Sequence, residues 1–123
     1  MVKKKIINAL FQELHKAIKE SANNTINNLT NPDLSYPPGI ELTESEKNEL
    51  KNLNLSQDAK SALEKLMTDA CSYPCFHLFS LLDGVTDPEA EDIDEWNGLS
   101  FCKRKDDEEM LHDEFYESYK TVE

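Results

Sequence analysis

Residues 75–82, Cys-Phe-His-Leu-Phe-Ser-Leu-Leu, form the most apolar window of the chain. A helix that is apolar on most of its sides is buried, because each of those sides needs an apolar neighbour. The window ends at Asp83-Gly84, and Gly84 suits the left-handed residue that closes a helix. We therefore expect residues 76–82 to lie at the centre of the domain, flanked by the N- and C-terminal helices.

The sequence before this window predicts a helix that Pro74 interrupts. Ser56 is a good N-cap residue, and Asp58 follows in the first turn, where the helix dipole favours an anion. A proline inside a helix removes a hydrogen bond and clashes with the preceding turn, so we expect a break or kink near Ser72-Tyr73. The expected buried face of this helix consists of Leu63, Leu66, Met67 and Ala70.

The N-terminal segment predicts an amphipathic helix. Asparagines 23, 24, 27 and 28 are poor helix formers, so we expect the helix to fray there and to stop before Asn31-Pro32. The apolar residues recur at steps of three and four and form one stripe: Ile7, Leu10, Phe11, Leu14, Ala17, Ile18 and Ala22.

A loop and two further helices complete the pattern. Residues 30–42 contain three prolines, so we expect a loop in which Tyr36-Pro37-Pro38 is a rigid connector. Thr43 and Glu46 have the spacing of a capping box that opens a short helix. The last helix is expected over residues 107–122, with an apolar stripe of Met110, Leu111, Phe115, Tyr119 and Val122.

Length and composition favour one small helical domain. A chain of 123 residues fits a single domain, and only three glycines argue against a turn-rich β-sandwich or barrel. We predict a mainly α fold, in which residues 1–123 form a single-domain bundle of four to five helices. One short extended segment is expected near residues 98–103, and an acidic loop at about residues 85–95.

The negative charge is concentrated at one end of the chain. Residues 83–123, called the acidic third below, carry 15 acidic and 4 basic side chains, whereas residues 1–82 carry 10 and 9. Such a field repels nucleic acid and anionic membranes and steers basic proteins toward the chain. No apolar run approaches the roughly 20 residues that cross a bilayer. We expect a cytoplasmic protein with a basic protein partner, and neither a nucleic-acid nor a membrane partner.

Aromatic residues lie among these acidic side chains, at Trp96, Phe115, Tyr116 and Tyr119. Aromatic anchors surrounded by charge are typical of binding hot spots. A solvated surface that only keeps the protein soluble is the alternative interpretation. The candidate partner-binding residues are Asp87, Glu91, Asp92, Asp94, Glu95, Trp96 and Tyr116.

The cysteines and histidines form a second candidate site. Zinc ligands are of these types, but the spacing does not match a Cys-x2-Cys knuckle, and packing in the core is the alternative. A Cys–His nucleophile needs a thiolate, which acidic surroundings oppose. We predict no cofactor, no catalytic residue and no enzymatic activity, with a metal-binding domain or a small enzyme as the alternatives. The candidate metal ligands are Cys71, Cys75, His77, Cys102 and His112.

Three stretches resemble a group of small bacterial proteins: residues 76–88, Trp96-Asn-Gly-Leu99 and residues 111–116. The resemblance covers about the last half of the chain, and no activity comes with it. In size, acidity and helical content, the chain is also similar to bacterial immunity proteins that inhibit basic nuclease toxins. That similarity lies in charge and size, without a shared motif, and it implies an immunity-type inhibitor of a basic protein.

Overall fold

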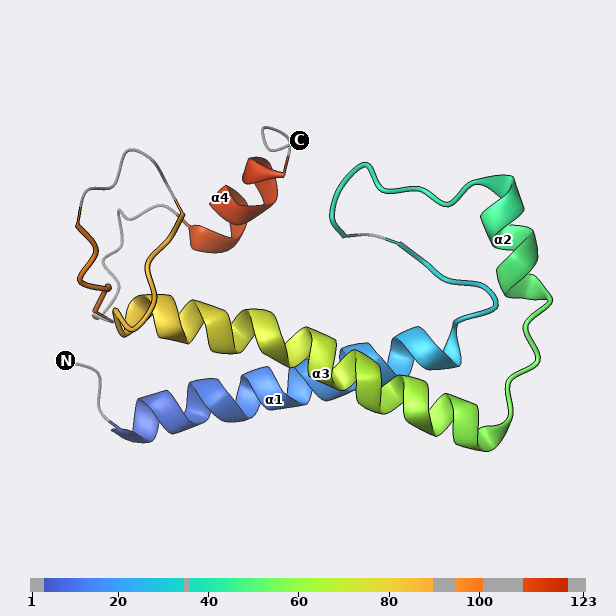
Figure 1. Ribbon diagram of the computed structural model, residues 1–123, viewed down its shortest axis with the longest axis horizontal. Coiled ribbons are helices and arrows are strands. Elements are labelled where there is room, and N and C mark those ends of the chain that lie inside the picture. Colours follow the sequence, from blue (N-terminus) through green and yellow to red (C-terminus); the bar gives the residue numbers. More distant parts are fainter. Residues whose placement is uncertain (1–3, 35, 90–94, 101–109, 120–123) are drawn as a thin grey trace.

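The computed structural model describes residues 4–34, 36–89, 95–100 and 110–119. Within these residues the chain forms four helices, which are α1 (Lys4–Asn27), α2 (Glu44–Lys51), α3 (Gln57–Leu82) and α4 (Leu111–Ser118) (Figure 1). The predicted mainly α fold with four to five helices is therefore confirmed at this level. Residues 95–100 have no regular secondary structure, and the rest of the predicted extended segment, residues 101–103, lies outside the described residues.

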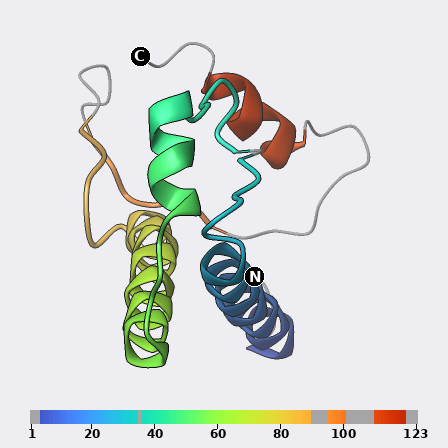
Figure 2. The same ribbon diagram turned by 90° about the vertical axis from the view of Figure 1, so that its right-hand side faces the viewer.

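The two long helices α1 and α3 lie side by side and run in opposite directions (Figures 1 and 2). They are the only helices in the described part of the chain that contact each other. The buried core consists of Ile18, Ala22 and Ile26, which lie four residues apart on one face of α1. Nearer the other end of the pair, the rings of Phe11 and Phe79 meet edge to face, with centroids 5.2 Å apart.

Helix α1 continues through three of the four asparagines that were expected to fray it and ends at Asn27. The Asn27 side-chain amide donates to Asn23 Oδ1 at 2.9 Å, and the Thr25 hydroxyl donates to the Ser21 carbonyl at 2.8 Å. Burial of Ile26, which is 7% exposed, adds a tertiary contact to this last turn. Packing therefore outweighs low helix propensity here, and the helix ends before Asn31-Pro32 as predicted.

A break or a kink was predicted near Ser72-Tyr73; helix α3 runs without interruption through Pro74, so the helix does not break there. The proline side chain is exposed, and Ser72 keeps the preceding turn closed by donating to the Thr68 carbonyl at 2.7 Å. Half-buried residues on both sides of the proline, among them Met67 and Phe79, maintain the register of the helix. Tertiary packing along the whole helix thus offsets the local cost of the proline.

The helix caps were predicted correctly. At the start of α2, the Glu46 amide donates to Thr43 Oγ1 at 3.1 Å, and the Thr43 amide donates to Glu46 Oε1 at 2.7 Å. At the start of α3, the Ala59 amide donates to Ser56 Oγ at 3.1 Å. These caps use residues three positions apart, so their geometry depends little on the rest of the fold.

The central position predicted for residues 76–82 is wrong. Phe76 is 70% exposed and Leu78 is 51% exposed, because α1 covers one side of α3 and no other described helix contacts it. Helix α4 begins at Leu111 and not at residue 107, since Met110 has an extended backbone (φ −85°, ψ 117°). Figure 2 shows α2, α4 and the loop before α2 above the α1–α3 pair.

Candidate protein-interaction surface

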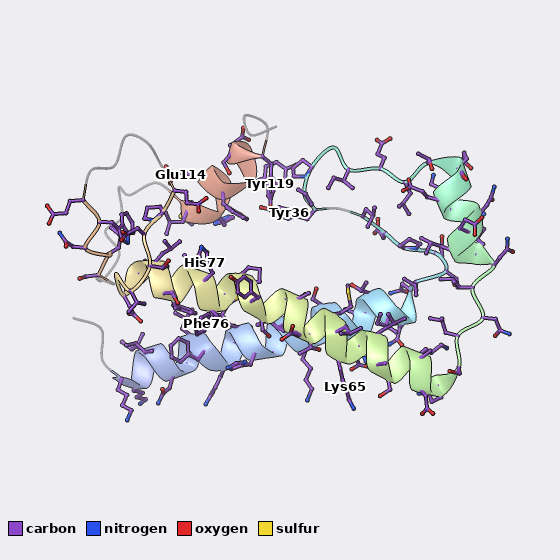
Figure 3. The ribbon with its side chains drawn as sticks, in the orientation of Figure 1. Tyr36, Lys65, Phe76, His77, Glu114 and Tyr119 are labelled. Carbon is purple, nitrogen blue, oxygen red and sulfur yellow. The ribbon has the colours of Figure 1, made fainter. Side chains whose placement is uncertain are left out.

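A cluster of four aromatic rings joins the loop before α2 to helix α4. Tyr36 lies against Phe115, Tyr116 and Tyr119, with ring centroids 6.3, 5.8 and 5.2 Å away. Phe115 and Tyr119 also touch each other at 5.2 Å, as expected for residues four apart on one helix face. Figure 3 shows Tyr36 and Tyr119 approaching each other from the loop and from the helix. We call these four residues the aromatic cluster.

The aromatic cluster faces solvent. Tyr36, Phe115 and Tyr116 are 47%, 57% and 40% exposed, and Tyr119 is half-buried. Partial burial raises the pKa of Tyr36, and interaction with the phenols of Tyr119 and Tyr116 raises it further. The Tyr36 side chain is therefore a neutral hydroxyl at physiological pH. Exposed carboxylates share α4 with the cluster, at Asp113, Glu114 and Glu117.

Sequence reasoning identified only part of this cluster. Tyr116 was a candidate binding residue, and it lies in the cluster. Tyr36 was interpreted as part of a rigid connector, and nothing near it in the sequence indicates that it meets α4 about 80 residues later. The sequence offered only a weak indication of this contact. Tyr36 precedes two prolines, and prolines restrict the backbone and so the direction in which the loop runs.

The predicted acidic binding residues fall into two groups. Asp87 and Glu95 are exposed, on the two sides of the loop that leaves α3. Glu91, Asp92 and Asp94 lie outside the described residues. Both residues belong to the segments that flank the end of α3.

Trp96 has a structural contact at that helix end. Its indole N–H donates to the Leu81 carbonyl at 2.8 Å, and the ring is half-buried. The Leu99 amide donates to the neighbouring Leu82 carbonyl at 2.9 Å. The Leu82 carbonyl is one that the last turn of a helix leaves without an intrahelical partner, and the Leu81 carbonyl accepts from Trp96 in addition to the Gly84 amide. The segment 95–100 thus caps α3, and Trp96 anchors it.

Two glycines make this close approach possible. Gly84 (φ +75°) closes α3 in a Schellman motif, with its amide on the Leu81 carbonyl at 3.1 Å and the Val85 amide on the Ser80 carbonyl at 3.0 Å. Gly98 (φ +87°) lies directly against it: a Cβ there would contact the Leu82 carbonyl oxygen and lie 2.9 Å from the Gly84 nitrogen. The predicted role of Gly84 as a C-cap is confirmed.

The candidate metal ligands are not brought together in the described residues. Cys71 and Cys75 are half-buried on α3, whereas His77 is exposed and stacks on Tyr73, with ring centroids 6.1 Å apart. His112 is exposed on α4, where its Nε2 lies 3.3 Å from the Asp113 carboxylate. Across the described parts of the chain, no group of three or more histidine, cysteine or carboxylate side chains could hold a metal ion. Cys102 lies outside them.

The cavities of the described structure are shallow or small. One of about 140 Å³ lies where the end of α1 meets the turn between α2 and α3, and its wall includes Ile26 and Leu55. Two larger hollows of about 380 and 350 Å³ follow the α1–α3 groove and share Lys19 and Glu64. Neither groups a histidine or cysteine with a carboxylate, so the exposed aromatic surface is the stronger candidate site.

No family model, no curated protein and no solved structure matches this chain. Among the helices of the described residues, none is both long enough and apolar enough to cross a membrane.

Proposed function

We propose that this chain is a non-enzymatic protein-interaction module that binds a basic protein through its acidic third. The observation that carries the proposal is the exposed aromatic cluster, whose α4 members lie among carboxylates. Aromatic rings bury a large area on binding and attract cationic side chains over their faces. The surrounding negative charge accelerates the encounter with a basic partner.

The specific form of this function that we propose is an immunity-type inhibitor of a basic toxin. A net charge of −12 on 123 residues is well suited to covering a cationic surface such as that of a nuclease. In this arrangement, residues around Asp87 and Glu95 steer the partner, and the aromatic cluster anchors it after contact. Trp96 contributes by fixing the loop to the end of α3.

The first test is native mass spectrometry of the tagged chain, purified gently from its own host at low salt. We expect a complex with one basic polypeptide that dissociates as the salt concentration rises, since exposed charges are screened over a Debye length of about 8 Å at physiological ionic strength. A chain that carries no basic protein under these conditions would contradict the proposal.

Charge variants then test the steering role. The pair Asp94→Lys and Glu95→Lys should lower the association rate constant on the order of tenfold at low salt. The matched control is Glu44→Lys with Glu49→Lys, which changes the net charge equally but on α2. Equal effects of the two pairs would mean that only net charge matters and that the acidic third has no specific role.

A second pair of variants tests the anchor. Tyr116→Ala should mainly raise the dissociation rate constant, because it removes a ring whose exposed part would be buried by the partner. Leu111→Ala is the control, since Leu111 is 77% exposed on the same helix and is not part of the aromatic cluster. A complex that tolerates Tyr116→Ala as well as it tolerates the control is not anchored by this cluster.

A further inference from the structure

Helix α3 presents a second apolar face that no described helix covers. Its half-buried stripe, Met67, Cys71, Cys75 and Phe79, recurs every four residues and faces α1, since Phe79 meets Phe11. At 100° per residue, Leu66, Tyr73 and Phe76 lie on the opposite side of the helix. These three side chains are 65%, 64% and 70% exposed. We call them, together with Ala62, Asp69, Ala70 and the half-buried Ser80 on the same side of the helix, the outer face of α3.

A helix that is apolar on two sides is typical of a position between two partners. Helix α1 is one partner of α3, and Leu66, Tyr73 and Phe76 lie on the side where no described helix supplies another.

We propose that the outer face of α3 is a homodimer interface, in which two copies of α3 pack antiparallel about a two-fold axis that crosses this face at the level of residue 71. The two helices cross near the middle of Figure 1, and Figure 2, which looks nearly along them, shows α1 on one side of α3 only. The open side extends along a helix of 26 residues, about 39 Å long. A second copy of α3 matches it in length.

The charge distribution favours a second copy in this orientation. Residues 1–82, which include α1 and α3, carry 10 acidic and 9 basic side chains, so the helix pair opposes self-association little. The acidic third follows directly after the C-terminal end of α3. Antiparallel packing keeps the two acidic thirds at opposite ends of the interface, whereas parallel packing would bring them together.

The residues of the outer face are self-complementary in one antiparallel register. With the axis at the level of residue 71, Leu66 lies opposite Phe76 of the second copy, and Phe76 lies opposite its Leu66. Tyr73 lies opposite Asp69 of the second copy, which gives the carboxylate a phenol donor at both symmetry-related positions. Parallel packing in register would place the two Asp69 carboxylates against each other. Ala62 and Ser80, also opposite, are small enough for close approach of the helices.

The test begins with the oligomeric state of the full chain, measured by sedimentation equilibrium in the presence of a reducing agent. We expect a mass of twice 14.1 kDa. The chain is studied alone, so the result does not depend on the basic partner proposed above. A wild-type chain that sediments as a monomer overturns the proposal.

Charge variants test the face and the register together. Leu66→Glu alone and Phe76→Lys alone should each raise the dimer dissociation constant on the order of 30-fold or more, because each places an unpaired charge in an apolar contact. The double variant should dimerise again, since the introduced carboxylate of one copy then faces the introduced ammonium of the other at two symmetric positions. Leu111→Glu, on exposed α4, is the control and should leave the dissociation constant unchanged.

Each outcome distinguishes a different part of the proposal. Single variants that still dimerise place the interface elsewhere, and a double variant that stays monomeric rules out the antiparallel register. Circular dichroism of the single variants should show wild-type helix content, because both side chains are exposed in one copy. If either single variant loses helix, Leu66→Ala and Phe76→Ala replace them and should still weaken the dimer.

Discussion

The α1–α3 pair and the acidic third are held in place by different kinds of contact. In the pair, apolar side chains meet along the length of two long helices, with Ile18, Ala22 and Ile26 buried. The described parts of the acidic third are attached at two points: segment 95–100 on the end of α3, and α4 on Tyr36. One arrangement distributes its stabilisation over many contacts, and the other depends on a few specific ones.

This difference explains what each region tolerates. The pair accommodates a proline in the middle of α3 and four asparagines near the end of α1, because no single residue determines the packing. The described parts of the acidic third depend on two left-handed glycines and two hydrogen bonds at the end of α3, and on the ring contacts of Tyr36 with α4. Substitutions in the α1–α3 pair should therefore change the free energy of unfolding of the whole domain. Substitutions in the acidic third should change only how firmly that region is held against α3 and Tyr36.

The largest expected effect is on the core of the pair. Ile26→Ala should lower the free energy of unfolding by about 2–4 kcal/mol, because Ile26 is only 7% exposed and shortening its side chain leaves a cavity. Urea unfolding followed by circular dichroism measures this loss. Ile6→Ala is the control, since Ile6 is 59% exposed on the same helix, and it should cost no more than about 0.5 kcal/mol. Similar losses for both variants would mean that α1 has no defined core.

The next effect isolates the attachment of the acidic third. Gly98→Ala should weaken the contact of segment 95–100 with α3 by about 1–3 kcal/mol, because its Cβ would meet the Leu82 carbonyl and because φ is +87°. Hydrogen exchange of the Leu99 amide, which donates to Leu82, should become faster, and the emission of Trp96, the only tryptophan, should shift.

Gly39→Ala provides the matched control for this experiment. Its φ is +83°, nearly that of Gly98, but a Cβ there meets nothing within 4 Å. It should therefore show only the cost of a left-handed conformation, about 1 kcal/mol, and should leave Leu99 exchange unchanged. If Gly98→Ala behaves in the same way, the close approach of the two loops is not what holds the acidic third.

The elements that sequence reasoning predicted correctly are those that depend on neighbouring residues. Thr43 with Glu46, Ser56 and Gly84 each cap a helix through contacts that lie within five positions in the sequence. The stripe of α1 follows from helical periodicity alone. Helix content and most helix ends could therefore be predicted before any tertiary contact was known.

The errors arise where distant residues decide the outcome. Pro74 was expected to break or kink α3, and the helix does not break, because local energetics were considered without the packing of the whole helix against α1. Trp96 bonds a carbonyl 15 residues earlier, and Tyr36 meets α4. No pattern within one segment encodes such pairs. Residues 76–82 were predicted to be central, and Leu66 and Ala70 to be buried, for the same reason; Leu66 is 65% exposed and Ala70 is exposed. Periodicity shows that a face is apolar and does not show what covers it.

A third prediction uses Pro74 to test whether the stability of the α1–α3 pair is spread over many contacts. Pro74→Ala should raise the free energy of unfolding by about 1–2 kcal/mol, since it restores an amide donor to an interior turn and the proline ring is exposed. Thermal unfolding measures the gain. Pro38→Ala, in the loop before α2, is the control and should give no gain. A loss of stability in Pro74→Ala would mean that α3 depends on the proline, contrary to the tolerance inferred above.

The smallest expected effect concerns α2, which contacts neither member of the pair. Hydrogen bonds from the backbone N–H of Thr43, and then from its side chain, hold the pKa of Glu46 below its ordinary value. Because the folded-state pKa is lowered, the capping box stabilises α2 fully above the ordinary glutamate pKa, and this contribution is lost as pH falls through the lowered value. Carboxyl-carbon NMR titration should show the lowered pKa directly.

The matched variant for this titration is Thr43→Ala, which removes the hydroxyl but keeps the backbone donor. It should return the pKa of Glu46 only part of the way toward its ordinary value, because the backbone hydrogen bond is the larger cause. A complete return would mean that the backbone donor of Thr43 is positioned by its own side chain. In that case α2 depends on a specific contact, like the acidic third, and unlike the α1–α3 pair.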